Sequence, residues 1–178
     1  MTDADEPVKI VVTGTPGTGK TTATERLADD IDKSVHHLND EIKEHDLWSE
    51  RDVDRDSLVT DLEAVTSHLG EWQGVLESHL AHHFEADRVV VLRCAPAELE
   101  ARLEARGDPE RKARENAESE ALDVVLSEAV DRHGTESVYE IDTTNHDPQG
   151  VADEIAAVIN GERAPSAGEV DFTEYLVP

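Results

Sequence analysis

Short apolar runs recur along the chain and alternate with segments in which apolar residues are spaced as on a helix. The runs lie at residues 8–13, 74–76, 88–94 and 138–141, and a shorter run at 34–38 predicts a further strand. Because the main runs are largely apolar rather than alternately polar, they are typical of strands buried on both faces of a parallel sheet. The alternation of strands and helices predicts βαβ units and an α/β fold.

The helices are predicted by apolar residues three and four positions apart. These stripes lie at residues 21–31, 99–103, 121–130 and 151–159. The stripe at 121–130 predicts one uninterrupted helix. Gly134 and Gly161 follow the last two helices and are expected to act as C-caps.

A chain of 178 residues has the length of a single domain. We place that domain at residues 1–161 and a C-terminal tail at 162–178. The tail contains proline, serine and glycine, and we expect it to be mobile as far as Phe172, Tyr175 and Leu176, which are expected to dock on the domain.

The first apolar run leads directly into the sequence Gly-Thr-Pro-Gly-Thr-Gly-Lys-Thr, which fills the pattern G-x-x-x-x-G-K-[ST]. In this pattern Gly14, Gly17 and Gly19 let successive backbone N–H groups surround a polyphosphate. Lys20 is expected to reach the terminal phosphates, and the Thr21 hydroxyl is expected to hold Mg²⁺ at the positive end of the following helix. A glycine-rich turn without a ligand has no need of the Lys-Thr pair, so the sequence predicts nucleotide binding.

Polar residues follow the apolar run at 74–76. In parallel α/β sheets the ligand lies at the carboxyl ends of the strands, so Glu77, Ser78 and His79 are expected to face the nucleotide. The Glu77 carboxylate suits Mg²⁺ through its water shell, and His79 suits the orientation of an attacking water or an acceptor group. The alternative is that Glu77 only ends a strand and that His79 is a surface residue.

Arg102 and Arg106 are one helical turn apart, so both guanidinium groups lie on one helix face, shortly before a Gly-Asp-Pro turn. This arrangement suits a small lid, at about residues 104–112, that closes over transferring phosphates and excludes water. The alternative is a solvated helix face whose arginines pair with Glu98 and Glu104.

The chain carries 42 acidic residues against 16 lysine and arginine residues, which gives a net charge of −26. The strand and helix periodicities indicate that these carboxylates cover a folded surface. Molar salt screens their repulsion, because the Debye length then falls to roughly 3 Å, so we interpret the chain as halophilic. The same charge is expected to repel nucleic acid and to attract basic proteins.

The sequence also bears on location. Cys94 is the single cysteine, the N-terminus lacks the basic and apolar regions of a signal peptide, and no apolar run approaches ~18 residues. We therefore expect a cytoplasmic protein that makes no contact with a membrane.

The nine histidines form no recognised zinc pattern. His79 lies near His82 and His83, and His36 is next to His37, but there is neither a His-Glu-x-x-His pattern nor a cysteine pair. We expect no zinc site that the protein holds by itself.

Three further blocks accompany the phosphate-binding loop. The four blocks, in chain order, are Thr13 to Thr22, the Glu77-x-His79 pair, Arg102-Leu103-x-x-Arg106-Gly107, and Lys112 with Asn116 and Glu120. Together they resemble the atypical adenylate kinases of archaea and eukaryotic nuclei, a family that also acts in maturation of the small ribosomal subunit. The resemblance runs from Ile10 to about Ile159. The family pattern at the second block is Asp-x-His, so Glu77 departs from it, and we expect altered geometry more than lost activity.

This resemblance implies a nucleoside monophosphate kinase-like P-loop fold of three layers, with a monophosphate-binding region at about 39–62 and a small lid. It implies reversible phosphoryl transfer from ATP to AMP or another nucleoside monophosphate, together with ATPase activity in which His79 takes part. The residues that the resemblance assigns to ATP and Mg²⁺ are Gly17, Gly19, Lys20, Thr21, Thr22 and Arg106.

The acceptor and the partner are less sharply defined. Lys43, Arg51 and Arg55 are cations in an acidic stretch, and one of them is expected to meet the acceptor phosphate; the alternative is pairing with neighbouring carboxylates. The resemblance also implies transient binding of a basic ribosomal protein of the small-subunit platform.

Two other functions use the same loop. One is an ATP-driven assembly factor whose kinase turnover is incidental. The other is a P-loop kinase of a small metabolite such as shikimate or gluconate, against which the Glu77-x-His79 pair and the absence of an Asp-x-Asp after the second strand both count.

Overall fold

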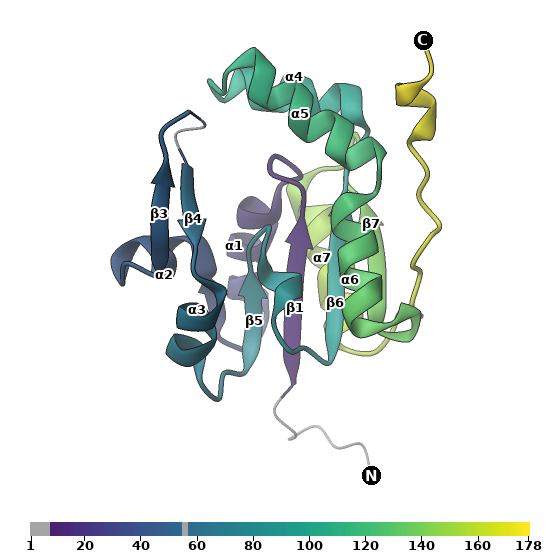
Figure 1. The fold of residues 1–178 in the computed structure, drawn as a ribbon. Helices are drawn as coiled ribbons and strands as arrows, with labels where there is room; N and C mark the ends of the chain where they lie inside the picture. Colours follow the sequence, from purple (N-terminus) through teal and green to yellow (C-terminus); the bar gives the residue numbers. More distant parts are fainter. Residues whose placement is uncertain (1–7, 55–56) are drawn as a thin grey trace.

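The computed structural model of the protein describes residues 8–54 and 57–178. The strands are β1 Lys9–Gly14, β2 Val35–His37, β3 Trp48–Asp52, β4 Ser57–Thr60, β5 Gly74–Glu77, β6 Arg88–Arg93 and β7 Val138–Asp142. Five of them form a parallel sheet in the order β2-β5-β1-β6-β7, and β3 pairs with β4 in a separate antiparallel hairpin (Figure 1). The predicted parallel α/β sheet, including its short additional strand, is confirmed.

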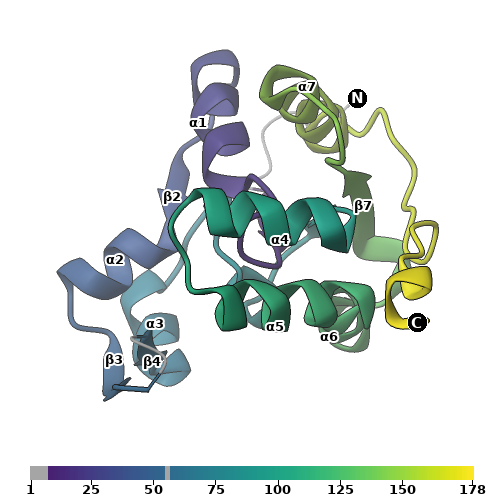
Figure 2. The same cartoon turned by 90° about the horizontal axis from the view of Figure 1, so that it is seen from above.

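The helices are arranged on both faces of this sheet and across one end of it. They are α1 Lys20–Asp30, α2 Leu38–Glu44, α3 Leu62–Leu69, α4 Pro96–Ala105, α5 Glu110–Ala121, α6 Val124–His133 and α7 Pro148–Ile159, with 3₁₀ turns η1 Ala81–His83, η2 Thr135–Ser137 and η3 Thr173–Leu176. Helices α1 and α7 cover one face, α3 and α6 cover the other, and the α4–α5 pair crosses the carboxyl ends of the strands (Figures 1 and 2). No helix in the described part of the chain is both long and apolar enough to span a membrane.

Neighbouring residues of the central strand supply two separate cores. The side chains of Ile10 and Val12 pack with those of α1 and α7, whereas Val11 packs with those of α3 and α6. All three are completely buried. Because a strand directs successive side chains to opposite faces, this arrangement explains why the run is apolar at every position.

The stripe at 121–130 is interrupted, so the prediction of one helix there is wrong. Helix α5 ends at Ala121, and Asp123 takes a left-handed conformation with a φ of 56° before α6 begins. The Asp123 carboxylate lies 2.5 Å from the guanidinium of Arg93. A tertiary ion pair therefore accompanies the break in the helical pattern.

Arg93 is the centre of a buried charge cluster. This residue, which is 1% exposed, ends β6 and forms ion pairs with Glu120 on α5, with Asp123, and with Glu140 on β7 at 2.7 Å. One cation is thus shared by three carboxylates that come from three parts of the fold. Burial raises the pKa of Glu120, and Arg93 opposes that rise.

The tail is more extensively held than the sequence suggests. Ser166 donates its backbone N–H to the carbonyl of Val138 at 3.0 Å, so the segment before Phe172 is bonded to β7 rather than unattached. Phe172 lies 5.4 Å from the Arg93 guanidinium, and the Tyr175 hydroxyl donates to Glu100 on α4 at 2.9 Å. Docking of these two aromatic residues is as predicted.

Candidate nucleotide and phosphoryl-transfer site

The loop between β1 and α1 leaves the amino end of α1 open for an anion. Gly19 precedes α1 with a φ of 92°, no side chain among the described residues caps the helix, and its first turn contains no acidic residue. Gly17 also has a φ of 92°, and a Cβ there would lie only 2.8 Å from Leu103 and 2.9 Å from Leu99 of α4. The two glycines therefore provide both the backbone shape and the close approach of the hairpin that a phosphate-binding loop needs.

Lys20 lies at the start of α1 and is 7% exposed. Its Nζ donates to the carbonyl of Thr15 at 3.2 Å. Burial lowers its pKa to about 8, while nearby Glu77 opposes that shift. Its ammonium group is thus positioned within the loop, with a proton affinity that a bound polyphosphate will increase.

This low pKa predicts proton uptake when ATP binds above pH 8. The triphosphate favours the charged ammonium, so the pKa of Lys20 in the complex lies above its value of about 8 in the free protein. The contribution of this group to affinity is then complete below pH 8 and falls by about tenfold per pH unit above it. Calorimetry at about pH 9, in two buffers of different ionisation enthalpy, measures the uptake. In Lys20→Ala the buffer dependence should disappear, and an unchanged buffer dependence would contradict the assignment.

Glu77 ends β5 beside the start of α1. The Thr21 hydroxyl donates to its Oε1 at 3.4 Å, and its Oε2 lies 2.9 Å from Nδ1 of His37. A hydroxyl and a carboxylate are oxygen donors of the kind that Mg²⁺ prefers, so Thr21 and Glu77 fit the predicted metal position. His37 is not among the residues predicted for the site; it faces Glu77 because β2 and β5 place these two residues in register.

His79, two residues after Glu77 in the chain, also lines the cavity. Burial lowers its pKa to about 4, and the charge of Lys20 adds to the effect. The imidazole is therefore neutral at ordinary pH, and a neutral imidazole can accept a hydrogen bond from water or donate one to an oxygen. Burial likewise lowers the pKa of the neighbouring His82.

The two predicted lid arginines both line the cavity, and each has a carboxylate partner. Arg102 pairs with Glu98 at 2.5 Å and donates to the carbonyl of Thr143 at 3.1 Å. Arg106 lies at the end of α4 and pairs with Asp108 at 2.6 Å. The predicted pairing with Glu98 is thus found for Arg102, whereas the partner of Arg106 is Asp108 and not the predicted Glu104. Carboxylate pairing and a position on the cavity wall, which the sequence presents as alternatives, occur together.

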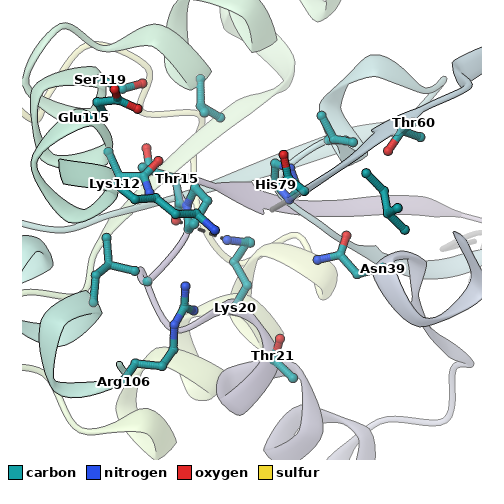
Figure 3. A pocket seen from close by; sticks show the side chains of 18 of the residues that line it. Thr15, Lys20, Thr21, Asn39, Thr60, His79, Arg106, Lys112, Glu115 and Ser119 are labelled. Atoms are coloured by element: carbon teal, nitrogen blue, oxygen red, sulfur yellow. Dashed lines mark hydrogen bonds between the residues drawn. The ribbon is translucent and has the colours of Figure 1, made fainter. Parts of the chain in front are cut away.

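Residues from α1, the end of α4 and α5 build the cationic side of the cavity. Lys20 points into it from α1, while Arg106 and Lys112 extend towards it from the α4–α5 hairpin (Figure 3). The charges of Lys20 and Lys112 both contribute to the low pKa of His79. Positive charge thus converges where the terminal phosphates of a nucleotide on the loop would lie.

The opposite side of the cavity is formed by α2, β4 and the start of α3. Lys43 lines it, together with Asn39 and Thr60, which the sequence analysis did not select (Figure 3). Arg51 lies on β3 and does not belong to the residues that line the cavity. Arg55 lies outside the described residues. Of the three predicted acceptor cations, the structure therefore brings Lys43 to the site.

The cavity connects both sides and has a volume of about 1120 Å³. A single small-molecule site typically occupies about 300–1,000 Å³. The cavity lies just above this range, so a ligand on the loop leaves space towards Lys43 for a second small one.

Comparison with known protein families gives a match to the AAA domain over residues 10–123. A relative named "Putative adenylate kinase" from Natronomonas pharaonis is 62% identical over 95% of this chain and 100% of its own length. A protein of the same name from Halobacterium salinarum is 54% identical, again over 95% of this chain and 100% of its own length. A third, from Methanothermobacter thermautotrophicus, is 44% identical over 94% of this chain and 99% of its own length.

Solved structures of low sequence identity share the fold. A shikimate kinase from Bacteroides thetaiotaomicron aligns with a TM-score of 0.58 at 17% identity, over 86% of this chain and 98% of that protein. A gluconokinase from Sinorhizobium meliloti aligns with a TM-score of 0.54 at 18% identity, over 88% of this chain and 93% of that protein. The α/β P-loop kinase fold is thus confirmed, and at these identities the likeness extends to the fold alone.

Proposed function

Because this chain belongs to the AAA domain family and to the family of the archaeal proteins named "Putative adenylate kinase", we propose that it is a nucleotide kinase. It transfers the terminal phosphoryl group of ATP to AMP or another nucleoside monophosphate. The observation that carries the proposal is the two-sided cavity of about 1120 Å³. Its loop side offers backbone N–H groups and Lys20, and its other side offers Lys43 and two neutral polar side chains. One nucleotide on each side would bring donor and acceptor phosphates together under the α4–α5 hairpin.

Catalysis in this arrangement rests on positioning and on electrostatic stabilisation. The loop amides and Lys20 hold the triphosphate, while Arg102, Arg106 and Lys112 face the charge that develops on the transferring group. Closure of the hairpin over the cavity would exclude water from that region. Mg²⁺ at Thr21 and Glu77 would supply further charge neutralisation. The acceptor oxygen belongs to a phosphate group, which is largely ionised at neutral pH. Transfer to it therefore requires little proton movement and no strong general base.

His79 provides a route to hydrolysis. Its neutral ring can orient a water in place of an absent acceptor, so we propose an ATPase activity at the same cavity. The supporting features are the position of the ring on the cavity wall and its pKa of about 4.

ADP formation with and without AMP tests these proposals. AMP is expected to increase ADP formation in the native protein, because transfer replaces the slower reaction with water. His79→Ala is expected to lower hydrolysis more than AMP phosphorylation. Equal losses of both activities would contradict a separate role for His79. ADP formation that responds to no nucleoside monophosphate, and to neither shikimate nor gluconate, would contradict kinase activity and favour the ATP-driven assembly factor.

A protein partner is the second part of the proposal. A net charge of −26 favours a basic protein over a polyanion, which supports transient association with a basic ribosomal protein of the small-subunit platform. Crosslinking in molar KCl tests this, and recovery of ribosomal RNA without a ribosomal protein would contradict it.

A further inference from the structure

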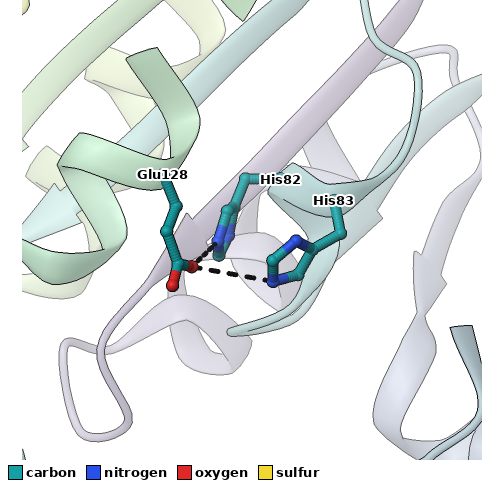
Figure 4. A group of neighbouring side chains, drawn as sticks. All are labelled: His82, His83 and Glu128. Carbon is teal, nitrogen blue, oxygen red and sulfur yellow. Dashed lines mark hydrogen bonds and ion pairs between the residues drawn. The ribbon is translucent and has the colours of Figure 1, made fainter. Parts of the chain in front are cut away.

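A second group of potential metal ligands lies at the wall of the same cavity, beside the proposed phosphoryl-transfer site. His82 and His83 belong to η1, which follows His79 closely in the chain, and Glu128 belongs to α6 (Figure 4). Nε2 of His82 lies 2.7 Å from Oε2 of Glu128, and Nε2 of His83 lies 3.6 Å from the same oxygen. Residues that are far apart in the sequence therefore direct two imidazoles and one carboxylate at a common point.

The spacing of these three donors suits a single transition-metal ion. All three ligand atoms lie within 4.8 Å of one another, and no other trio of this kind occurs within residues 8–54 and 57–178. Ligands placed about 2.0–2.2 Å from a tetrahedral Zn²⁺ ion are separated from each other by roughly 3.4 Å. The separations of 2.7 and 3.6 Å from Glu128 lie on either side of that value, so small side-chain adjustments complete the geometry.

The surroundings of His82 also fit a metal ligand. The side chain is completely enclosed, and its Nδ1 lies 2.7 Å from the hydroxyl oxygen of Thr13. In the tautomer that donates Nδ1–H to Thr13, the lone pair of Nε2 is directed at the shared point. His133 donates to the backbone carbonyl of His82 at 2.8 Å and fixes the turn on which both histidines lie.

We propose that His82, His83 and Glu128 bind one divalent transition-metal ion, preferably Zn²⁺. Two imidazoles and one carboxylate favour such an ion over Mg²⁺, which prefers an all-oxygen environment. Both His83 and Glu128 also line the large cavity, so the remaining coordination position is open towards it. The sequence alone predicts no zinc site. The reason is that the third ligand, Glu128, lies on a helix at no recognisable spacing from the two histidines.

A bound ion would join η1 to α6 and so restrain the segment that carries His79. Without an ion, Glu128 only accepts a hydrogen bond from His82 and pairs with His83. A true metal site and a cluster that is only hydrogen-bonded differ in their affinity for Zn²⁺. This affinity can be measured in the absence of nucleotide. The outcome is therefore independent of whether the proposed kinase activity is correct.

Titration calorimetry with ZnCl₂ tests the site. The full chain is kept nucleotide-free in molar KCl with excess Mg²⁺, so that Mg²⁺ competes for the acidic surface. We expect one Zn²⁺ per chain, with an affinity that falls by at least about tenfold in His83→Ala and in Glu128→Gln, since even residues that only orient a ligand typically contribute about 10–100-fold. Both positions are partly exposed, which leaves the fold intact, and circular dichroism verifies this.

His68→Ala is the matched control. His68 has a side-chain exposure of 30%, against 31% for His83, and it also pairs with a glutamate, Glu41, at 3.3 Å. This variant is expected to bind Zn²⁺ as the native chain does. Co²⁺ in place of Zn²⁺ gives an independent readout, because imidazole ligands at a four-coordinate site intensify its visible absorption. Native-like affinity in His83→Ala and Glu128→Gln, or the same loss in His68→Ala, would overturn the proposal.

Discussion

Lys20→Ala is expected to abolish most of the phosphoryl transfer, with a fall in turnover of at least about 10²–10³-fold, the typical loss when one preorganised donor to a developing charge is removed. Lys20 is buried at the start of α1 and points into the cavity that holds the proposed triphosphate. Its role cannot pass to Lys112 or Arg106, because both of these belong to the hairpin across the cavity. Turnover is measured as ADP formation from ATP and AMP in molar KCl.

Two controls accompany this variant. Lys33→Ala removes the same charge between α1 and β2, at a residue that does not line the cavity, and is expected to keep full activity. Calorimetry of ATP binding shows whether Lys20→Ala also loses ground-state affinity. A Lys20→Ala protein that remains folded and retains more than a tenth of native turnover would refute the assignment of this cavity as the site of transfer.

Arg93→Ala is expected to lower the free energy of unfolding by about 3–5 kcal/mol, the usual cost of removing one partner from a buried ion pair. The guanidinium serves Glu120, Asp123 and Glu140 together, and two of these carboxylates are almost fully enclosed. Without it, buried negative charges lose their shared cation while water cannot replace it. Chemical denaturation at constant molar KCl measures the loss.

The pH dependence identifies the cause of this loss. Burial already raises the pKa of Glu120, and removal of Arg93 removes an opposing influence, so the pKa of this carboxyl rises further. A group whose pKa is raised on folding contributes stability below its unfolded pKa and loses it as the pH rises through the folded value. The deficit of Arg93→Ala should therefore shrink as the solution is made acidic.

Arg111→Ala provides the matched change at the surface. This arginine has an exposure of 83% and pairs with Glu115 one helical turn away, so its loss is expected to cost no more than about 0.5 kcal/mol. A deficit in Arg93→Ala that equals the one in Arg111→Ala, or that grows towards acid pH, would contradict the role assigned to the buried cluster.

The features that follow from local pattern are those that the sequence predicts well. Residues 89–92 are all apolar because alternate residues of β6 pack into opposite cores, so this continuous apolar stretch marks a strand that is buried on both faces. The loop at 14–21 is equally local, because its glycines, lysine and threonine act within one turn of the chain. Helix α1 begins one residue earlier than expected, at Lys20.

The features that depend on distant contacts are those that local pattern misses. The β3–β4 hairpin is largely solvent-facing and its residues are mostly polar, so it has no apolar alternation to indicate strands. The break at Asp123 coincides with an ion pair to Arg93, thirty residues earlier in the chain. Neither the register of a pair of strands nor the burial of an arginine can be obtained from the spacing of apolar residues.

The site shows the same division. Glu77 and His79 are near Lys20, as the rule for the carboxyl ends of parallel strands predicts. The partnership of Glu77 with His37 is decided by the pairing of β2 with β5, forty residues apart in the chain. Arg51 resembles Lys43 in the sequence, but the fold directs only Lys43 into the cavity wall.

The tail has a consequence for solubility. β7 is the last strand of the sheet, and an uncovered outer strand offers its backbone groups as a template for intermolecular pairing. Here Ser166 donates to the carbonyl of Val138 and accepts from the N–H of Glu140, while Arg163 donates to the carbonyl of Glu140. Salt screens charge repulsion between molecules, so in molar KCl these hydrogen bonds of the tail would keep that border of the sheet occupied where the acidic surface repels less.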